Sequence, residues 1–136
     1  MCKVTIEQLC AHYDKVVELR ELQSTRDGMK EYSTVLSKEL SENDLLKKIN
    51  LEIARLDKKI IATESELEME WNIIEKSLYC IKDDIATNAA RLHYRDGMMW
   101  ADIAYITKYS SEDGIKSRVS RALKKYGINN SRKLKG

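Results

Sequence analysis

The chain has 136 residues and a net charge of +2 at neutral pH, and 34% of its residues are charged. This length fits one domain, or one domain with an oligomerisation element. The absence of proline and the presence of only five glycines predict an almost entirely helical protein. The sequence has no run of about 18 apolar residues and no signal-peptide core, so we expect a cytoplasmic protein.

Side chains that could support catalysis or metal binding are few and scattered. Cys2, Cys10 and Cys80 are an odd, unclustered set without a partner at metal-ligand spacing, which favours reduced thiols. The only imidazoles, His12 and His93, belong to no recognisable set of nucleophile, base and orienting group. We therefore expect a protein that is not an enzyme and that uses no metal or cofactor.

The first 40 residues predict one or two helices. The capping box Thr5-x-x-Gln8 predicts a helix that starts near Thr5, and apolar residues follow at helical spacing. Asp27-Gly28 is the predicted end of this helix, after which helical spacing resumes from 29 to 40. The capping residues of 41–44 predict a loop.

The longest apolar pattern begins at Leu45 and predicts a helical rod roughly 57 Å long. Its stripe consists of Leu46, Ile49, Ile53, Leu56, Ile60, Leu67, Trp71, Ile74 and Leu78. The stripe must be buried against the first helices, against a second copy of the chain, or against both. Ile61, Met69 and Tyr79 lie off the stripe, which favours an oligomer, with a dimer the preferred state.

The last third of the chain predicts three short helices. Asp83-Asp84 caps the first of them, whose apolar stripe is Ile85, Ala89 and Leu92. Arg95-Asp96-Gly97 ends it, 100–107 gives the second, and Ser110 or Ser111 caps the third. A small core is predicted around Trp100, formed by Ile103, Ile106, Ile115, Val119, Ala122 and Leu123. The pattern is that of a helix-turn-helix.

Charge is divided unevenly along the chain. Residues 1–90 hold 13 Lys and Arg against 18 Asp and Glu, a net charge of −5; residues 91–136 hold 11 against 4, a net charge of +7. Phosphate contacts supply most of the non-specific attraction of proteins to DNA. The positive charge therefore lies on the part of the chain that carries the helix-turn-helix pattern, as DNA binding requires.

Several short motifs in this region carry a resemblance. They are Tyr94-Arg95-Asp96-Gly97, Trp100-x-x-Ile103-Ala104, a following Ser, and Arg121-Ala122-Leu123-Lys124-Lys125. Together they resemble the promoter-reading fourth region of sigma-70-type factors, in the form found in phage regulators of the RinA/ArpU kind. The resemblance covers about the last third of the chain, and Lys108 stands where that family usually has Gly. It implies a transcription regulator of phage or mobile-element origin, of the late-gene activator type.

The third helix of the pattern is the expected reading helix. Its inward positions follow Ile115, and its outward positions are predicted to meet bases through Lys116, Ser117, Ser120 and Arg121, with Asp113 tuning base choice. The expected contacts to the DNA backbone are Lys108, Ser110, Ser111, Lys124 and Lys125. Arg118 lies nearer the core edge.

The sequence thus predicts an all-α protein with a long N-terminal helical hairpin or coiled coil over 1–82. A helix-turn-helix module over 83–127 and a basic tail over 128–136 follow. We expect a sequence-specific regulator that binds double-stranded DNA in a bacterial host cell. Two alternatives remain open: a phage small terminase subunit that recognises packaging-site DNA, and a sigma-like mimic that binds RNA polymerase or another regulator.

Overall fold

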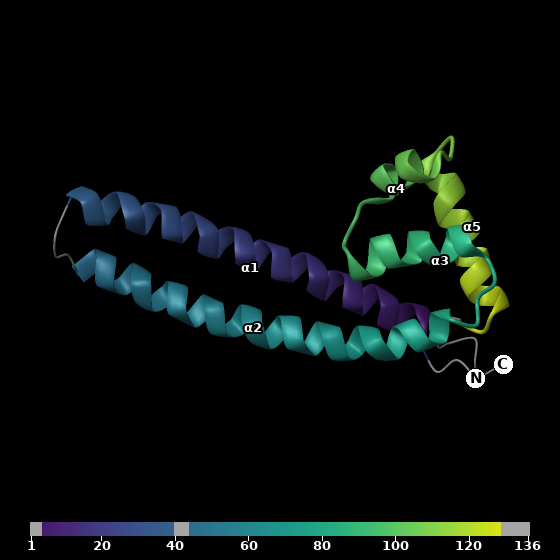
Figure 1. Cartoon of the computed structure of the whole chain (residues 1–136), viewed down its shortest axis with the longest axis horizontal. Coiled ribbons are helices and arrows are strands. Elements are labelled where there is room, and N and C mark those ends of the chain that lie inside the picture. The colour runs from purple at the N-terminus through teal and green to yellow at the C-terminus, as the bar shows by residue number, and fades with distance from the viewer. Residues whose placement is uncertain (1–3, 40–43, 129–136) are drawn as a thin grey trace. The chain divides into compact units, whose positions relative to one another are not determined.

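The computed structural model describes residues 4–39 and 44–128. Helices and connecting turns, without a strand, make up this described part, which confirms the all-α prediction (Figure 1). The helices are α1 (Ile6–Glu39), α2 (Asp44–Leu78), α3 (Asp84–Ala90), the π-helical turn η1 (Arg91–Arg95), α4 (Trp100–Thr107) and α5 (Glu112–Lys125). No helix within the described ranges is long and apolar enough to cross a membrane.

The chain divides into two compact units, and both long helices contribute to both of them. Residues 17–66 form the helix-pair unit. Residues 1–16 and 67–136 belong to the other, the core unit, which contains α3, η1, α4 and α5. The boundaries between these two units, after residues 16 and 66, lie elsewhere than the predicted domain boundary at residue 82.

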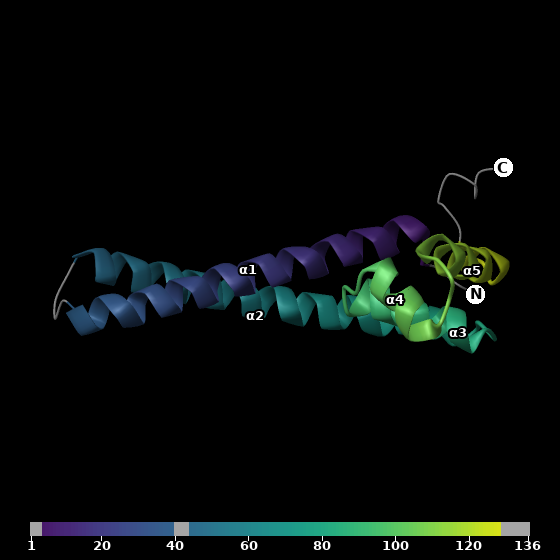
Figure 2. The same cartoon turned by 90° about the horizontal axis from the view of Figure 1, so that it is seen from above.

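In the helix-pair unit, α1 and α2 run side by side in opposite directions, as Figures 1 and 2 show from two sides. Arg26 donates to Asp57 over 3.3 Å, and Ser33 donates to Asn50 over 2.8 Å. From Arg26 to Ser33 the chain advances seven residues along α1, while their partners on α2 go back seven residues, from Asp57 to Asn50. This constant register is that of an antiparallel helix pair.

Residues 27 and 28 do not end the first helix, so that prediction is wrong. α1 continues through Gly28 to Glu39. A glycine inside a helix costs about 1 kcal/mol relative to alanine. α1 nevertheless contacts α2 on both sides of Gly28, through Arg26 and Ser33. Of the loop predicted at 41–44, the first three residues lie outside the described ranges, and α2 begins at the fourth.

The apolar stripe of α2 is largely buried within one chain. Leu56 and Ile60 are buried in the helix-pair unit, while Leu46, Ile49 and Ile53 are half-buried there; in the core unit Leu67, Trp71, Ile74 and Leu78 are buried. The sequence left open whether this stripe packs against the first helices of the same chain, against a second copy, or against both. In the structure it packs against α1 of the same chain. A second copy as an additional partner stays a prediction, and Ile61, Met69 and Tyr79 are exposed.

The core unit joins the start of α1 and the end of α2 to the three short helices. The predicted capping box starts α1: the Thr5 N–H donates to Gln8 over 2.7 Å, and the Gln8 N–H donates to the Thr5 hydroxyl over 3.2 Å. This start places Leu9 in one continuous core, fully buried. The same core contains Trp71, Ile74, Leu78, Ala89, Ile103, Ile115, Val119 and Leu123.

A charged pair fixes α2 to the end of α3. Arg91 donates to both carboxylate oxygens of Glu75, over 2.9 Å from Nε to Oε1 and 2.7 Å from Nη2 to Oε2. Hydrogen bonding by Arg91 lowers the pKa of Glu75. Glu75 also accepts from the indole N–H of Trp71 over 3.3 Å. Together with the apolar core, this two-point contact sets the position of η1 against α2.

The start of α1 is expected to be essential for the stability of the core unit. Leu9→Ala should lower the free energy of unfolding by about 2–5 kcal/mol, because it leaves a cavity in a filled core. Leu51→Ala is the matched control, since Leu51 is 72% exposed, and it should change stability by less than about 0.5 kcal/mol. Urea unfolding followed by circular dichroism measures both. Equal midpoints for the two variants would contradict this packing.

Candidate nucleic-acid interface

α3 begins at its predicted cap but ends at Ala90, and the π turn η1 carries the chain on to Arg95. The predicted α-helical end at Arg95-Asp96-Gly97 is therefore wrong, and the buried face also differs from the predicted one. The Asp83 carboxylate accepts from the Ala86 N–H over 3.1 Å and caps the helix. Gly97, with φ 73°, ends the following π turn. Ala86 and the two alanines 89 and 90 are buried, whereas Ile85 is exposed, so its predicted core position is wrong. The buried face of α3 therefore consists of small side chains, which allow close approach of neighbouring helices.

α4 coincides with its predicted range, and a tight turn joins it to α5. Lys108 adopts the left-handed conformation, with φ 62°, and the Tyr109 N–H donates back to the Ala104 carbonyl over 2.9 Å. The Ser111 hydroxyl then accepts from the Gly114 N–H over 3.1 Å and caps α5. Ile106 is exposed and its predicted core position is wrong, because α4 turns this side away from the core.

α5 buries its predicted inward face and ends at Lys125, two residues before the predicted terminator Gly127. Ile115, Val119, Ala122 and Leu123 are buried. Gly127 has φ 92°, and the Ile128 N–H donates to the Leu123 carbonyl over 2.8 Å, a helix-ending pattern that brings the next side chain back to the core. Ile128, assigned to the basic tail by the sequence pattern, is fully buried. The remaining tail, 129–136, lies outside the described residues.

Arg118 ties α5 to the start of α3. Its guanidinium donates to both Asp83 oxygens, over 2.9 and 3.0 Å, and to the Tyr109 hydroxyl over 2.6 Å. Hydrogen bonding with Arg118 lowers the pKa of Asp83, and the same bond raises the pKa of Arg118. Arg118 thus orients α3, α5 and the turn before α5, and its charge is used within the fold.

A basic hollow of about 430 Å³ lies on this side of α5. Lys82, Arg121 and Lys125 line it together with Tyr109 and Tyr126. All three cations are exposed, and none forms an ion pair with a carboxylate in the described part of the chain. Lys82 was missed by the sequence reasoning, because only the fold brings the residue before the α3 cap next to α5.

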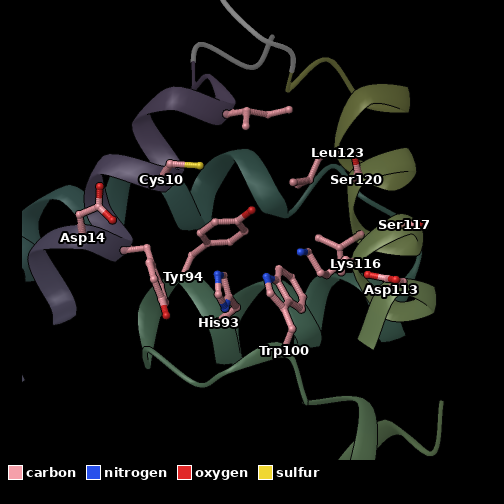
Figure 3. Close-up of a pocket in the computed structure, with 13 residues that line it drawn as sticks. Cys10, Asp14, His93, Tyr94, Trp100, Asp113, Lys116, Ser117, Ser120 and Leu123 are labelled. Atoms are coloured by element: carbon pink, nitrogen blue, oxygen red, sulfur yellow. The ribbon is translucent and has the colours of Figure 1, made fainter. Parts of the chain in front are cut away.

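The opposite side of α5 borders a second cleft, of about 530 Å³ (Figure 3). Asp113, Lys116, Ser117 and Ser120 line it, facing Cys10 and other residues of α1. The structure therefore divides the predicted DNA contacts. Arg121 and Lys125 line the basic hollow, whereas Asp113, Lys116, Ser117 and Ser120 line the second cleft, which we call the aromatic cleft. Lys124 is exposed and lines neither, and Lys108, Ser110 and Ser111 lie in the turn between α4 and α5.

Aromatic rings from three elements line the aromatic cleft. Tyr13 of α1 and Trp100 of α4 each stack on His93 of η1, with ring centroids 4.1 Å apart in both pairs. His93 is buried, and its Nδ1 donates to the Met98 carbonyl over 2.8 Å in the neutral imidazole. Burial lowers the pKa of His93 below its ordinary value of 6.5, and the nearby charge of Lys116 lowers it further.

A search of protein families, curated proteins and solved structures finds no match to this chain. In the described residues, no three His, Cys, Asp or Glu side chains come together as a group that could hold a metal ion.

The left-handed Lys108 is expected to strain the turn before α5. Because this conformation costs a residue with a Cβ atom roughly 1–2 kcal/mol and suits glycine, Lys108→Gly should stabilise the protein by up to about 1 kcal/mol. Lys108→Ala also removes the charge but keeps the Cβ atom, so it should give no such gain. Thermal unfolding compares the two. A stabilisation by alanine equal to that by glycine would show that charge, not backbone strain, is responsible.

His93 is expected to make stability depend on pH. The pKa of His93 is lower in the folded protein than in the unfolded chain, where it is near 6.5. The contribution of neutral His93 to the free energy of unfolding is therefore complete above pH 6.5. It is lost as the pH falls toward the folded-state pKa, because the unfolded chain binds a proton that the folded protein does not. The free energy of unfolding should therefore fall as the pH is lowered below about 6.5. His93→Phe keeps a ring but cannot titrate, and its stability should fall less over this range. Parallel slopes would contradict this assignment.

Proposed function

We propose that this protein is a DNA-binding transcription regulator with a helix-turn-helix similar to the fourth region of sigma-70-type factors. The observation that supports it best is the basic hollow beside α5, where Lys82, Arg121 and Lys125 are exposed and have no carboxylate partner within residues 4–39 and 44–128. The proposal includes the RinA/ArpU-type origin from a phage or mobile element and action in the cytoplasm of a bacterial host.

The arrangement of charge supports contact with a duplex through α5. Lysine and arginine side chains bind phosphate oxygens, and such contacts position a protein on DNA without reading its sequence. The basic hollow would follow the sugar-phosphate backbone through its three cations. The outward side of α5, with Ser117 and Lys124 exposed, would then face the major groove, where base edges are read.

A protein partner is the second candidate, and the surface of α4 favours it. Met99, Tyr105 and Ile106 are exposed there, with Tyr105 86% exposed. Exposed apolar side chains close together are typical of protein contacts. A sigma-like mimic that binds RNA polymerase through α4 would use this surface and would not need the basic hollow.

Selection of fragments from the source genome by the purified protein tests the proposal. We expect one enriched site, bound with an affinity that falls steeply between about 50 and 200 mM salt. An inverted repeat in that site would support a dimer, and its place in the genome would separate a promoter from a packaging site. Uniform, weak recovery of all fragments would contradict sequence-specific binding.

The basic hollow gives a sharper prediction. Arg121→Ala combined with Lys125→Ala should weaken DNA binding and reduce the slope of log K against log salt by about 2, because each lost phosphate contact removes roughly 0.9. Lys58→Ala combined with Lys59→Ala removes the same charge from the helix-pair unit, where both side chains are exposed. Fluorescence anisotropy at several salt concentrations measures both slopes. Equal losses in the two variants would show that only net charge matters.

A further inference from the structure

The aromatic cleft has the size and lining of a small-molecule site. Its volume of about 530 Å³ falls within the roughly 300–1,000 Å³ typical of ligand pockets. Ile6, Val119 and Leu123 give it apolar walls, and Tyr94 and Trp100 give it aromatic ones. All of these residues belong to the core unit. An apolar cleft with a few polar groups is the usual form of a binding site for an organic molecule.

The rings of this cleft are held in place from several directions. Besides the stack of Tyr13, His93 and Trp100, the ring of Tyr94 stands edge-on to His93, with centroids 4.8 Å apart and an interplanar angle of 81°. His93 is further fixed by its hydrogen bond to the Met98 carbonyl. The rings therefore do not need to be ordered by a ligand, which lowers the entropic cost of binding.

The polar groups of the cleft are mainly hydrogen-bond donors near neutral pH. Burial raises the pKa of Tyr94 to about 12, so its hydroxyl keeps its proton. Burial, with the charges of Asp14 and Glu7, raises the pKa of the Cys10 thiol. Ser117 and Ser120 add hydroxyl groups from α5.

Lys116 supplies the positive charge of the cleft. Its ammonium end points inward, toward Trp100, whereas Asp14 and Asp113 lie at opposite sides of the cleft (Figure 3). Lys116 forms no ion pair with a carboxylate in the described ranges. Lys116 is exposed to solvent, but its charge lies beside the aromatic and apolar lining of the cleft, where screening is weaker than in bulk water.

We propose that the aromatic cleft binds a small planar aromatic anion, whose ring lies against Tyr94 and Trp100 and whose anionic group pairs with Lys116. Lys116, Ser117 and Ser120 are also predicted DNA contacts. If the proposed function holds, the ligand therefore occupies one side of the reading helix and weakens DNA binding. The ligand site itself does not depend on the DNA proposal.

Anilinonaphthalene sulfonate, a fluorescent anion with a planar naphthalene ring system, is a suitable probe for the full-length protein. We expect saturable binding at one site, with an increase in probe fluorescence. Lys116→Ala should weaken binding about tenfold, since it removes one charged hydrogen bond. Lys124→Ala is the matched control on the same helix; Lys124 is exposed and does not line the cleft. It should leave probe affinity unchanged.

Two further comparisons test the location and the charge of the ligand. Ser120→Trp should fill the cleft and remove saturable binding, whereas Ile61→Ser, which removes an exposed apolar group in the helix-pair unit, should not affect it. Phenylnaphthylamine, which has similar rings but no sulfonate, should bind more weakly than the sulfonate. Its binding should also be insensitive to Lys116→Ala.

The outcomes separate the two proposals. Equal effects of Lys116→Ala and Lys124→Ala, or equal affinity for the charged and neutral probes, would overturn an anion site at Lys116. Saturable binding at the cleft by a protein that does not bind DNA would overturn the proposed function and support the ligand site. Where both bind, a loss of DNA affinity with rising probe supports competition at α5, and unchanged DNA affinity overturns it.

Discussion

The stacking of Tyr13 and Trp100 on His93 is the contact on which the core unit depends most. These rings come from α1, η1 and α4, and Tyr13 of α1 is remote in the sequence from the other two. By joining them, the stack makes the first turns of α1 part of the same compact unit as α5. The buried Leu9 continues this contact into the apolar core. The three short C-terminal helices are therefore not packed as a separate core.

This packing gives α5 two sides with different chemistry. On one side the Arg118–Asp83 pair and the Tyr109 hydroxyl bring Lys82, Arg121 and Lys125 around a basic hollow. On the other side, α1 and the ring stack border a cleft in which Lys116 faces aromatic walls. Phosphate binding suits the first side, because its three cations are exposed and form no ion pair with a carboxylate among the described residues. Binding of an organic anion suits the second, because one cation lies beside apolar surface.

Local interactions made much of the helical structure predictable. The Thr5–Gln8 capping box, the Asp83 and Ser111 caps and the left-handed Gly97 and Gly127 all act within a few residues of the chain. Such signals depend on nearby backbone groups alone. The inward face of α5 followed from helical spacing for the same reason. The exposed Ile85 and Ile106 show where spacing was insufficient, because each lies on a short helix whose free side depends on distant neighbours.

The sequence by itself determined the all-α class, most helix ends, the burial of Trp71 and the concentration of positive charge after residue 90. These properties follow from composition and from contacts between residues close in the chain. Only the tertiary structure decided that α1 continues through Gly28, that Lys82 joins Arg121, and that Lys116 faces a cleft. Each of these features depends on contacts between residues that are remote in the sequence. Local sequence patterns carry no information about the free energy of such contacts.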